Sequence, residues 1–426
     1  MSKKNFIGKI ISILFLVLFC SIAASAQKKN DITVKLEVLL EKAKLKSHKL
    51  LASYSNMQAS KFAWKKQSMF ENPKFGFAYN NSPLKTFPAL DETAMSGMVL
   101  SVSQKIYFPW ESSSRKRESY WRYMSARQKT AEVERTLEMQ VRISYHRYGF
   151  FVLQKKLLMK SETALKNIAA SARGLVAANK MSSAQLLKLE ADINKVATLV
   201  LNVDSNMVQA KNKLESLLGF DSKIIDEDFG NYWQTLKIKK NGFRFKIKQH
   251  PLVKVFDNRA KAATAAYGLS KAKTLPAVTF SGAYTIRQPL ASGGTGDDFI
   301  SLKAAMPIPL FYGLKNTHQI SQKKLQLVTT IEMTKQVELN LSTMWKSVKK
   351  QYQNLLKSAS HYRTKVNPMA FASYKAQLGA FASGTVKLLD VLDAYRFYLK
   401  SNIDYQKVRM QLFKAHAQII YFVGDK

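Results

Sequence analysis

Apolar residues recur along this chain with the two periods that distinguish helices from strands. In the stretch 186–217 they follow one another at alternating spacings of three and four, as Leu186, Leu189, Ile193, Val196, Val200, Val203, Met207, Ala210, Leu214 and Leu217. This spacing is typical of a coiled-coil seam, and Gly219 is placed to end the helix. Long helices are also predicted over 32–69, 112–168, 247–273, 314–367 and 369–422, with turns near 161–172 and at Pro368.

Four shorter stretches alternate with a period of two, which predicts strands. Their apolar positions are Phe75, Phe77 and Tyr79; Met98, Leu100, Val102 and Ile106; Val278, Phe280, Tyr284 and Ile286; and Ile300, Leu302, Met306, Ile308 and Leu310. Each stretch has one apolar face and one small or polar face, and its length suits a tilted strand that crosses a membrane. The alternative is an ordinary water-soluble hairpin with one buried face.

Aromatic residues gather at the ends of these strands. Such a girdle is typical of the level at which a spanning strand leaves the lipid. We therefore predict that the membrane-interface aromatics are Phe75, Tyr107, Phe108, Trp110, Phe311 and Tyr312.

The same order of helices and strands occurs twice. His48 recurs as His250 at an offset of 202 residues (250 − 48), and Pro73 recurs as Pro276 at an offset of 203 (276 − 73). In each copy, long helices flank one pair of strands. We predict a first structural repeat over 27–219, a linker or equatorial segment over 220–245, and a second repeat over 246–426.

Residues 1–26 have the pattern of a cleaved signal peptide, with a lysine-rich start, an apolar run and Ala24-Ser25-Ala26 before the cleavage point. The apolar run is shorter than a membrane-spanning helix needs, which argues against a permanent anchor. Cys20 is the single cysteine. A lipoprotein would use Cys20, but the bulky Phe19 before it disfavours that alternative. The pattern predicts an exported protein without disulfides or thiolate metal sites.

The formal net charge is +38. The lysines are spread over the whole chain, which indicates solvated helix surfaces or attraction to anionic solutes and lipopolysaccharide phosphates. Nucleic acid is not the expected partner, because the basic residues do not cluster and the chain is exported. The sequence shows no zinc motif, phosphate-binding loop or nucleophile–base spacing. We therefore predict no enzymatic activity, no cofactor and no metal site.

Four strands cannot close a barrel, and an open sheet edge in lipid leaves backbone groups unpaired. Several chains must therefore share one barrel, and three chains would give twelve strands. The helices are too polar outside their seams to enter lipid, so we expect them to project into water, packed side by side as a tube. The predicted fold class is mainly α with membrane β.

Motifs distributed over 34–424 resemble those of the TolC-type outer-membrane efflux proteins. They are Asn72-Pro73, Leu100-Ser101-Val102-Ser103-Gln104, His250-Pro251-Leu252, Pro307-Ile308-Pro309-Leu310 and the stretch from Ser383 to Leu392. The last resembles the recurring family motif Tyr-x-x-Gly-x-x-Ser-x-x-Asp-Leu-Leu, with Gly384 and Asp390 at the glycine and aspartate. In the first copy, Asn179, Ser182 and Gln185 stand at the glycine, serine and aspartate.

This resemblance implies a homotrimer in the outer membrane, with a twelve-strand β-barrel on a twelve-helix periplasmic α-barrel. It implies a passive exit duct of a tripartite efflux pump or type I secretion system for small molecules, metal ions or proteins. The partners would be a periplasmic adaptor protein and an inner-membrane transporter. The paired His-Pro and Asn-Pro features point to the heavy-metal efflux branch. The alternative function is a periplasmic coiled-coil adaptor or scaffold; a barrel enzyme would need many consecutive strands.

The resemblance also implies a gate where the paired helices turn at the periplasmic tip. The predicted turns place it near 161–172 in the first copy and at Tyr362, Arg363, Lys365 and Asn367 in the second. Arg363 and Lys365 would make the constriction cationic and favour anionic cargo. The alternative is that both side chains face outward into solvent.

Overall fold

The computed structural model describes residues 36–219, 242–273, 277–308 and 312–424. The signal segment 1–26, most of the linker 220–245, the aromatic Phe311, and Pro276, Pro309 and Leu310 lie outside the described residues. The chain divides into two compact units, and each unit takes segments from both halves of the sequence. Unit 1 comprises Met1–Lys42, Ser144–Lys237 and Met369–Lys407, and unit 2 comprises Ala43–Ile143, Ile238–Pro368 and Val408–Lys426.

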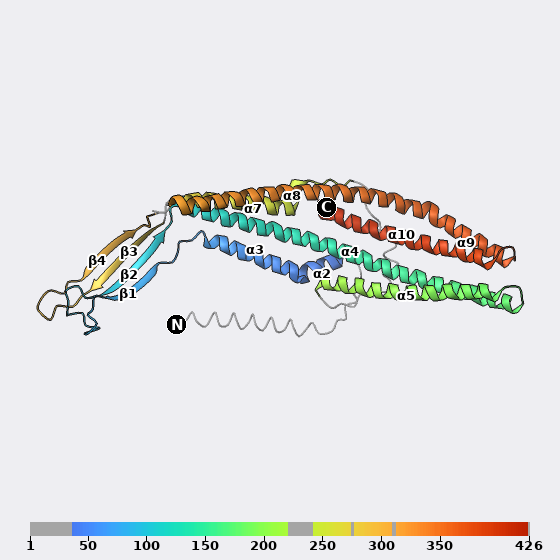
Figure 1. Cartoon of the computed structure of the whole chain (residues 1–426), viewed down its shortest axis with the longest axis horizontal. Helices are drawn as coiled ribbons and strands as arrows, with labels where there is room; N and C mark the ends of the chain where they lie inside the picture. The colour runs from blue at the N-terminus through green and yellow to red at the C-terminus, as the bar shows by residue number, and fades with distance from the viewer. Residues whose placement is uncertain (1–35, 220–241, 274–276, 309–311, 425–426) are drawn as a thin grey trace, which may run out of the picture. The chain divides into compact units, whose positions relative to one another are not determined.

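Helices account for most of the described chain (Figure 1). The helix predicted over 32–69 is divided into α2 (Leu36–Lys46) and α3 (His48–Lys66), because Ser47 between them has an extended backbone conformation. After the first strand pair come α4 (Pro109–Ala177), which has 69 residues, and α5 (Ser183–Leu218). The short η1 (Ile247–Gln249) and α7 (Pro251–Ala272) precede the second strand pair. Across the described ranges, no helix has a stretch apolar enough to span a lipid bilayer.

The four predicted strands are present as β1 (Lys74–Asn80), β2 (Gly97–Ile106), β3 (Val278–Ile286) and β4 (Phe299–Ala305). They form one sheet in the order β1-β2-β3-β4, and each neighbouring pair is antiparallel (Figure 1). β4 ends at Ala305, before the predicted end at 310, and Pro307 explains this because proline has no N–H to offer a strand ladder. The order brings the two strand pairs, far apart in sequence, side by side at β2 and β3.

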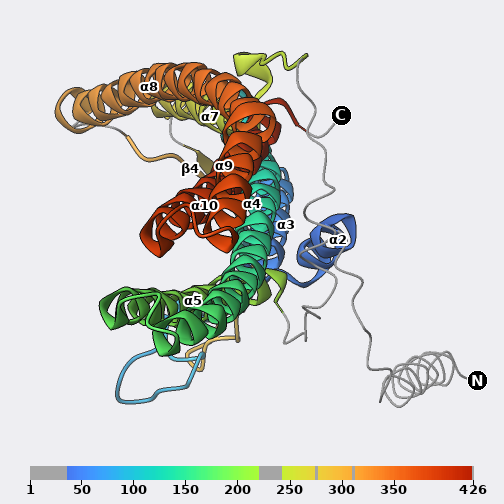
Figure 2. The same ribbon diagram turned by 90° about the vertical axis from the view of Figure 1, so that its right-hand side faces the viewer.

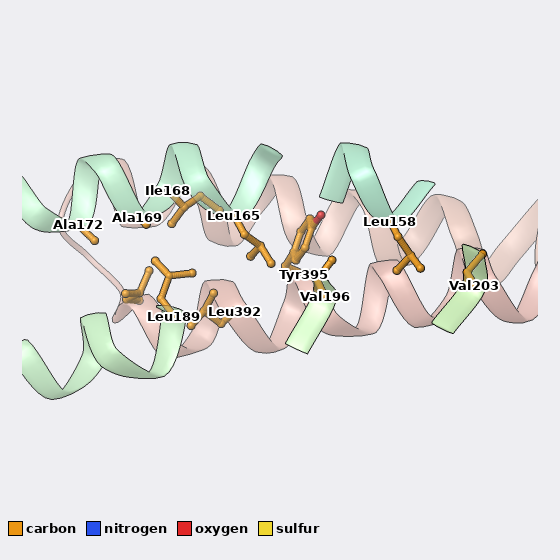
Figure 3. Packing of buried hydrophobic residues seen from close by; sticks show 11 residues of the cluster. Leu158, Leu165, Ile168, Ala169, Ala172, Leu189, Val196, Val203, Leu392 and Tyr395 are labelled. Atoms are coloured by element: carbon orange, nitrogen blue, oxygen red, sulfur yellow. The ribbon is translucent and has the colours of Figure 1, made fainter. Parts of the chain in front are cut away.

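In unit 1, helices α4, α5 and α10 (Leu388–Val423) share one apolar core (Figure 3). The buried residues Leu189, Val196 and Val203 of α5 are seven positions apart, so the predicted apolar seam is buried along one face of α5, while the coiled coil itself stays a prediction. They pack with two further sets, Leu165, Ile168, Ala169 and Ala172 of α4, and Leu388, Leu392 and Tyr395 of α10.

The turn predicted near 161–172 is wrong, because these residues lie inside α4. The segment contains polar residues, but its apolar residues Leu165, Ile168 and Ala172 recur at helical spacing and are buried in the core of unit 1. The polar positions occupy the other faces of a continuing helix. The chain reverses only after Ala177, over residues 178–182.

The turn predicted at Pro368 is also wrong. Helix α8 (Tyr312–His361) continues through the π-helical turn η2 (Tyr362–Val366) into α9 (Asn367–Ala382), and the chain reverses over 383–387. A proline in a helix normally clashes with the carbonyl four residues earlier and leaves it without a donor. In η2 the Asn367 N–H bonds to the Tyr362 carbonyl, five residues back, and this wider turn admits Pro368 without ending the helix.

In unit 2, α7 lies along α8 (Figure 2). The core of this unit contains Val253, Leu341, Val348, Tyr352, Leu412, Ala415, Ile419 and Phe422. His250 caps the start of α7 at the edge of this core, where its Nδ1 accepts a hydrogen bond of 3.3 Å from the Leu252 N–H. Its ring is 1% exposed and lies 4.9 Å from that of Tyr421. The repeat counterpart His48 is exposed, so the two histidines have different roles.

We expect the free energy of unfolding to decrease as the pH falls from about 6.5 to about 4, because of His250. Burial, and then the nearby Arg135, lower the pKa of His250 from 6.5 to about 4, against smaller opposing effects of the Tyr421 backbone and Glu132. The unfolded chain therefore binds a proton that the folded chain does not. The contribution is complete above pH 6.5 and is lost as the pH falls through 4, and it amounts to about 3 kcal/mol.

His250→Asn tests this expectation, because asparagine keeps an N-cap acceptor but does not titrate. Denaturant unfolding followed by circular dichroism at several pH values should show a flatter profile for this variant between pH 6.5 and pH 4. An identical slope in the variant and the parent would assign the acid sensitivity to other groups.

Candidate functional site

One face of the four-stranded sheet is apolar and exposed. The strand register aligns Phe77, Leu100, Tyr284 and Ile300 in one row across the sheet, and the next row contains Phe75, Val102, Gly282 and Leu302. Leu302 is 87% exposed, and Phe75, Phe77, Val102, Tyr284 and Ile300 are exposed as well. Monomeric soluble proteins rarely present so continuous an apolar surface to water, so this face is built to meet an apolar environment.

The opposite face of the sheet has a different composition. Its rows contain Gly76, Ser101, Ala283 and Ser301, and then Lys74, Ser103, Ser281 and Lys303. Small and hydroxylated residues dominate, and both edge strands carry a lysine. The alternation predicted from the sequence therefore separates an apolar face from a hydrophilic one.

The sheet is open along both sides. β1 and β4 each pair with one neighbour among the described residues, so the outer row of N–H and C=O groups on each strand has no strand partner. Such edges can pair with another strand. In an environment without water they would have to do so, because an unsatisfied backbone group there costs several kcal/mol.

Aromatic side chains lie where β2 leads into α4. The rings of Phe108 and Trp110 are stacked with centroids 4.7 Å apart. The Tyr107 ring lies below the Arg115 guanidinium at 4.3 Å, and its hydroxyl bonds to the Glu71 carboxylate. Sequence reasoning identified the rings but missed Glu71 and Arg115, which have no local signal and meet Tyr107 only through the fold. The interface role of these aromatics stays a prediction.

The two helical hairpins turn in the same way. Asn179 (φ 54°) and Gly384 (φ 77°) both have left-handed backbones. In the first turn the Lys180 N–H donates to the Leu175 carbonyl at 2.8 Å, and in the second the Thr385 N–H donates to the Ala380 carbonyl at 2.9 Å. These are equivalent Schellman closures, so both copies end their outgoing helix with the same motif.

The helices that follow these two turns each have one of the two hydrogen bonds of a capping box. Ser182 caps α5, and its hydroxyl accepts a hydrogen bond from the Ala184 N–H at 3.3 Å. In the second copy Lys387 has no such acceptor, but Asp390 reaches back and accepts from the Lys387 N–H at 3.1 Å. A complete capping box has both bonds. Gln185 holds the position equivalent to Asp390.

We expect Gly384→Ala to destabilise the second hairpin by about 1–2 kcal/mol, because a Cβ is disfavoured in the left-handed region. A Cβ at Gly384 would meet no atom within 4 Å, so the cost comes from the backbone alone. Gly384→Asn is the matched control, since Asn179 already occupies the equivalent position. Hydrogen exchange of the amides of 376–395 should be faster in the alanine variant than in the asparagine variant. Equal hydrogen-exchange rates in the two variants would mean that the left-handed backbone at residue 384 does not determine the stability of this turn.

The residues predicted to form a constriction do not lie at a hairpin turn. Tyr362, Arg363 and Lys365 belong to η2, Asn367 begins α9, and the whole of α9 separates them from the turn over 383–387. Arg363 and Lys365 are exposed, whereas Tyr362 and Asn367 are half-buried. Their predicted position at the tip is therefore wrong, and a role for the two cations in cargo selection stays a prediction.

Comparison with known proteins shows which family and which solved structures this chain resembles. Residues 247–425 match the family model described as outer membrane efflux protein. No curated protein matches the chain.

Solved structures share the fold over nearly the whole chain. CusC has a TM-score of 0.77 and 14% sequence identity, with 93% of this chain and 93% of CusC covered. The outer membrane protein VceC from Vibrio cholerae has a TM-score of 0.76 and 13% identity, with 91% and 96% covered. The MtrE outer membrane channel of Neisseria gonorrhoeae has a TM-score of 0.74 and 15% identity, with 91% and 88% covered. At these identities the likeness establishes the fold.

Proposed function

Because residues 247–425 match the outer membrane efflux protein family model and the described chain has the fold of solved outer-membrane channels, we propose that it forms the outer-membrane exit duct of a tripartite efflux pump or type I secretion system. The resemblance to TolC-type proteins and the mainly helical fold with a four-stranded sheet are thereby confirmed, and they support an outer-membrane location. This is a family of channels rather than enzymes.

The observation that carries the proposal is the two-faced sheet. Its apolar face suits lipid, and its small, hydroxylated and lysine-bearing face suits a wet lumen. A water-soluble adaptor would cover such an apolar face with its own chain, whereas here Leu302 and Ile300 stay exposed. This argues against the alternative of a periplasmic adaptor or scaffold.

The open edges support a shared barrel. If β4 of one copy pairs with β1 of the next, every edge is satisfied once the ring closes. Three copies of the four-stranded sheet would give twelve strands, within the range of known membrane barrels. We therefore propose a homotrimer, with the long helices extending into the periplasm to meet an adaptor protein and an inner-membrane transporter.

Cysteine cross-linking tests the shared barrel. Within one chain, β1 and β4 are separated by β2 and β3, so their backbones lie about 14 Å apart. A disulfide needs Cα atoms within about 7 Å. Ala78→Cys is combined in turn with Phe299→Cys, Ser301→Cys or Lys303→Cys, all with Cys20→Ser. We expect one combination to give covalent trimers in outer membranes, with the single variants as controls.

Conductance in planar bilayers tests the duct itself. Purified trimers should produce stable current steps, and a cross-linked trimer should still do so because closure of the ring is the proposed native state. A protein that stays monodisperse without detergent, gives no cross-linked trimers and gives no current would contradict the duct and restore the adaptor alternative.

A further inference from the structure

Unit 1 contains a groove that the proposed duct does not require. It has a volume of about 360 Å³ and lies among α4, α5 and α10. Its floor is formed by Leu165, Val196 and Leu392, which are all buried. Figure 3 shows these residues and Tyr395 converging from the three helices. Because the floor belongs to the core of unit 1, the groove is preformed, which is the usual condition of a small-molecule site.

The walls of the groove are apolar as well. They are formed by Leu199 of α5 and by Leu399 and Ile403 of α10, which are only partly covered. The Tyr395 ring completes the wall, and its hydroxyl bonds to the buried Ser161 hydroxyl of α4. The Tyr395 hydroxyl therefore already has a hydrogen-bond partner within the protein. The interior is suited to hydrocarbon rather than to a polar ligand.

The dimensions distinguish a small ligand from a partner helix. From Leu392 to Ile403 the groove follows α10 for eleven residues (403 − 392), which is roughly 16 Å. The volume of about 360 Å³ lies within the range of small-molecule sites. An α-helix with its side chains is about 10–12 Å wide, so along this length it would occupy more than ~1,000 Å³. The groove therefore suits an alkyl chain better than a whole helix.

The charges at the mouth select the head group. Arg396 is neutralised, because it pairs with Asp192 at 2.6 Å and with Asp393 at 2.6 Å. Lys195 and Lys400 also line the groove, are exposed, and have no ion pair among the described residues. Asp192 is the one carboxylate in the lining, and it is already paired with Arg396. With Asp393 counted, three cations face two carboxylates, so the mouth carries a surplus of one positive charge, and the two lysines are its charged groups without an ion pair among the described residues.

We propose that this groove binds an anionic amphiphile with a medium-length alkyl chain, such as an alkyl carboxylate. The chain lies on Leu165, Val196 and Leu392, and the carboxylate lies at the mouth with Lys195 and Lys400. The apolar floor supplies affinity and the two ammonium groups supply selectivity for the negative head group. The inference uses contacts within unit 1 alone, and it requires that the assembled protein leaves this groove open.

Binding of radiolabelled decanoate tests the proposal. The full chain is transferred from detergent into an amphipathic polymer, so that no free detergent competes, and is examined by equilibrium dialysis. We expect saturable binding that is weakened about 5- to 10-fold by Lys195→Gln with Lys400→Gln, the loss of two exposed charge contacts. Decanol should bind more weakly than decanoate, and decyltrimethylammonium more weakly still.

Matched variants keep the test specific. Lys188→Gln with Lys407→Gln removes two exposed lysines from the same helices outside the groove, and it should leave decanoate binding unchanged. Leu199→Trp, on the open wall, should fill the groove and abolish binding while helicity and trimer migration are retained. If Lys188→Gln with Lys407→Gln weakened decanoate binding as much as Lys195→Gln with Lys400→Gln, the effect would be one of net charge. That result would overturn the proposal.

A photoreactive decanoate locates the bound ligand directly. We expect its cross-links on peptides of α5 and α10 that contain Leu199, Leu399 or Ile403. Cross-links confined to the strand sheet, or no saturable binding at all, would overturn the proposal. The second result would be expected if a neighbouring copy or an adaptor covered the groove.

Discussion

Val102→Arg combined with Leu302→Arg is expected to abolish insertion into the outer membrane. The two residues lie in the same cross-strand row near the middle of the sheet, on its apolar face. An arginine at the midplane of a membrane barrel costs about 2–4 kcal/mol, so the pair costs about 4–8 kcal/mol in each chain. Membrane fractionation after urea extraction should find the parent protein in the outer membrane and the variant in the soluble or aggregated fraction.

The matched control places the same charges on the same two strands but on the other face. Ser101→Arg with Ser301→Arg adds two arginines to the row that contains Gly76 and Ala283. That face already carries Lys74, Lys105 and Lys303. We expect insertion to be retained and only the current through the channel to change. Equal extraction of both double variants would mean that the apolar face does not contact lipid.

Leu189→Ala is expected to destabilise the first hairpin by about 2–5 kcal/mol. Leu189 is completely buried between α4, α5 and α10, and its loss leaves a cavity that these helices can close only in part. The nearby turn over 178–182 should then open more often. Limited proteolysis at this turn, followed over a temperature series, should show cleavage at lower temperature than in the parent.

Leu187→Ala is the control for this prediction. Leu187 lies two positions earlier on the same helix and is 65% exposed, so its truncation should cost less than about 0.5 kcal/mol. The difference between the two variants measures burial alone, because residue type and helix are the same. A cost at Leu187 as large as that at Leu189 would show that another surface covers this face in the assembled protein.

The sequence predicted the strands and the α5 seam because both depend on a local period. Alternation in Phe75, Phe77 and Tyr79 places three rings on one face of any extended backbone, whatever packs on it. The seven-residue recurrence of Leu189, Val196 and Val203 similarly requires one helix face. Neither prediction needs knowledge of distant contacts.

The turns were not predictable from composition. Pro368 was expected to end a helix, but the π-helical hydrogen bond from Asn367 to Tyr362 accommodates it. The chain turns at Asn179 and Gly384, where the backbone is left-handed. The family motif marks these two positions, and the left-handed backbone there, rather than the proline at 368, ends the outgoing helices. The groove in unit 1 has no sequence signal, since its residues come from three helices.

The open sides of the sheet also have a kinetic consequence. Before its copies meet, each chain exposes two unpaired strand edges together with the apolar side chains of β4, an arrangement prone to aggregation through edge-to-edge pairing. The lysines Lys74 and Lys303 on the two edge strands hinder unregulated stacking of such sheets. In the proposed trimer, correct pairing needs three chains at once, so the yield of inserted protein should rise steeply with the concentration of subunits. Slow synthesis would therefore lengthen the time during which single chains, with their open edges, can aggregate.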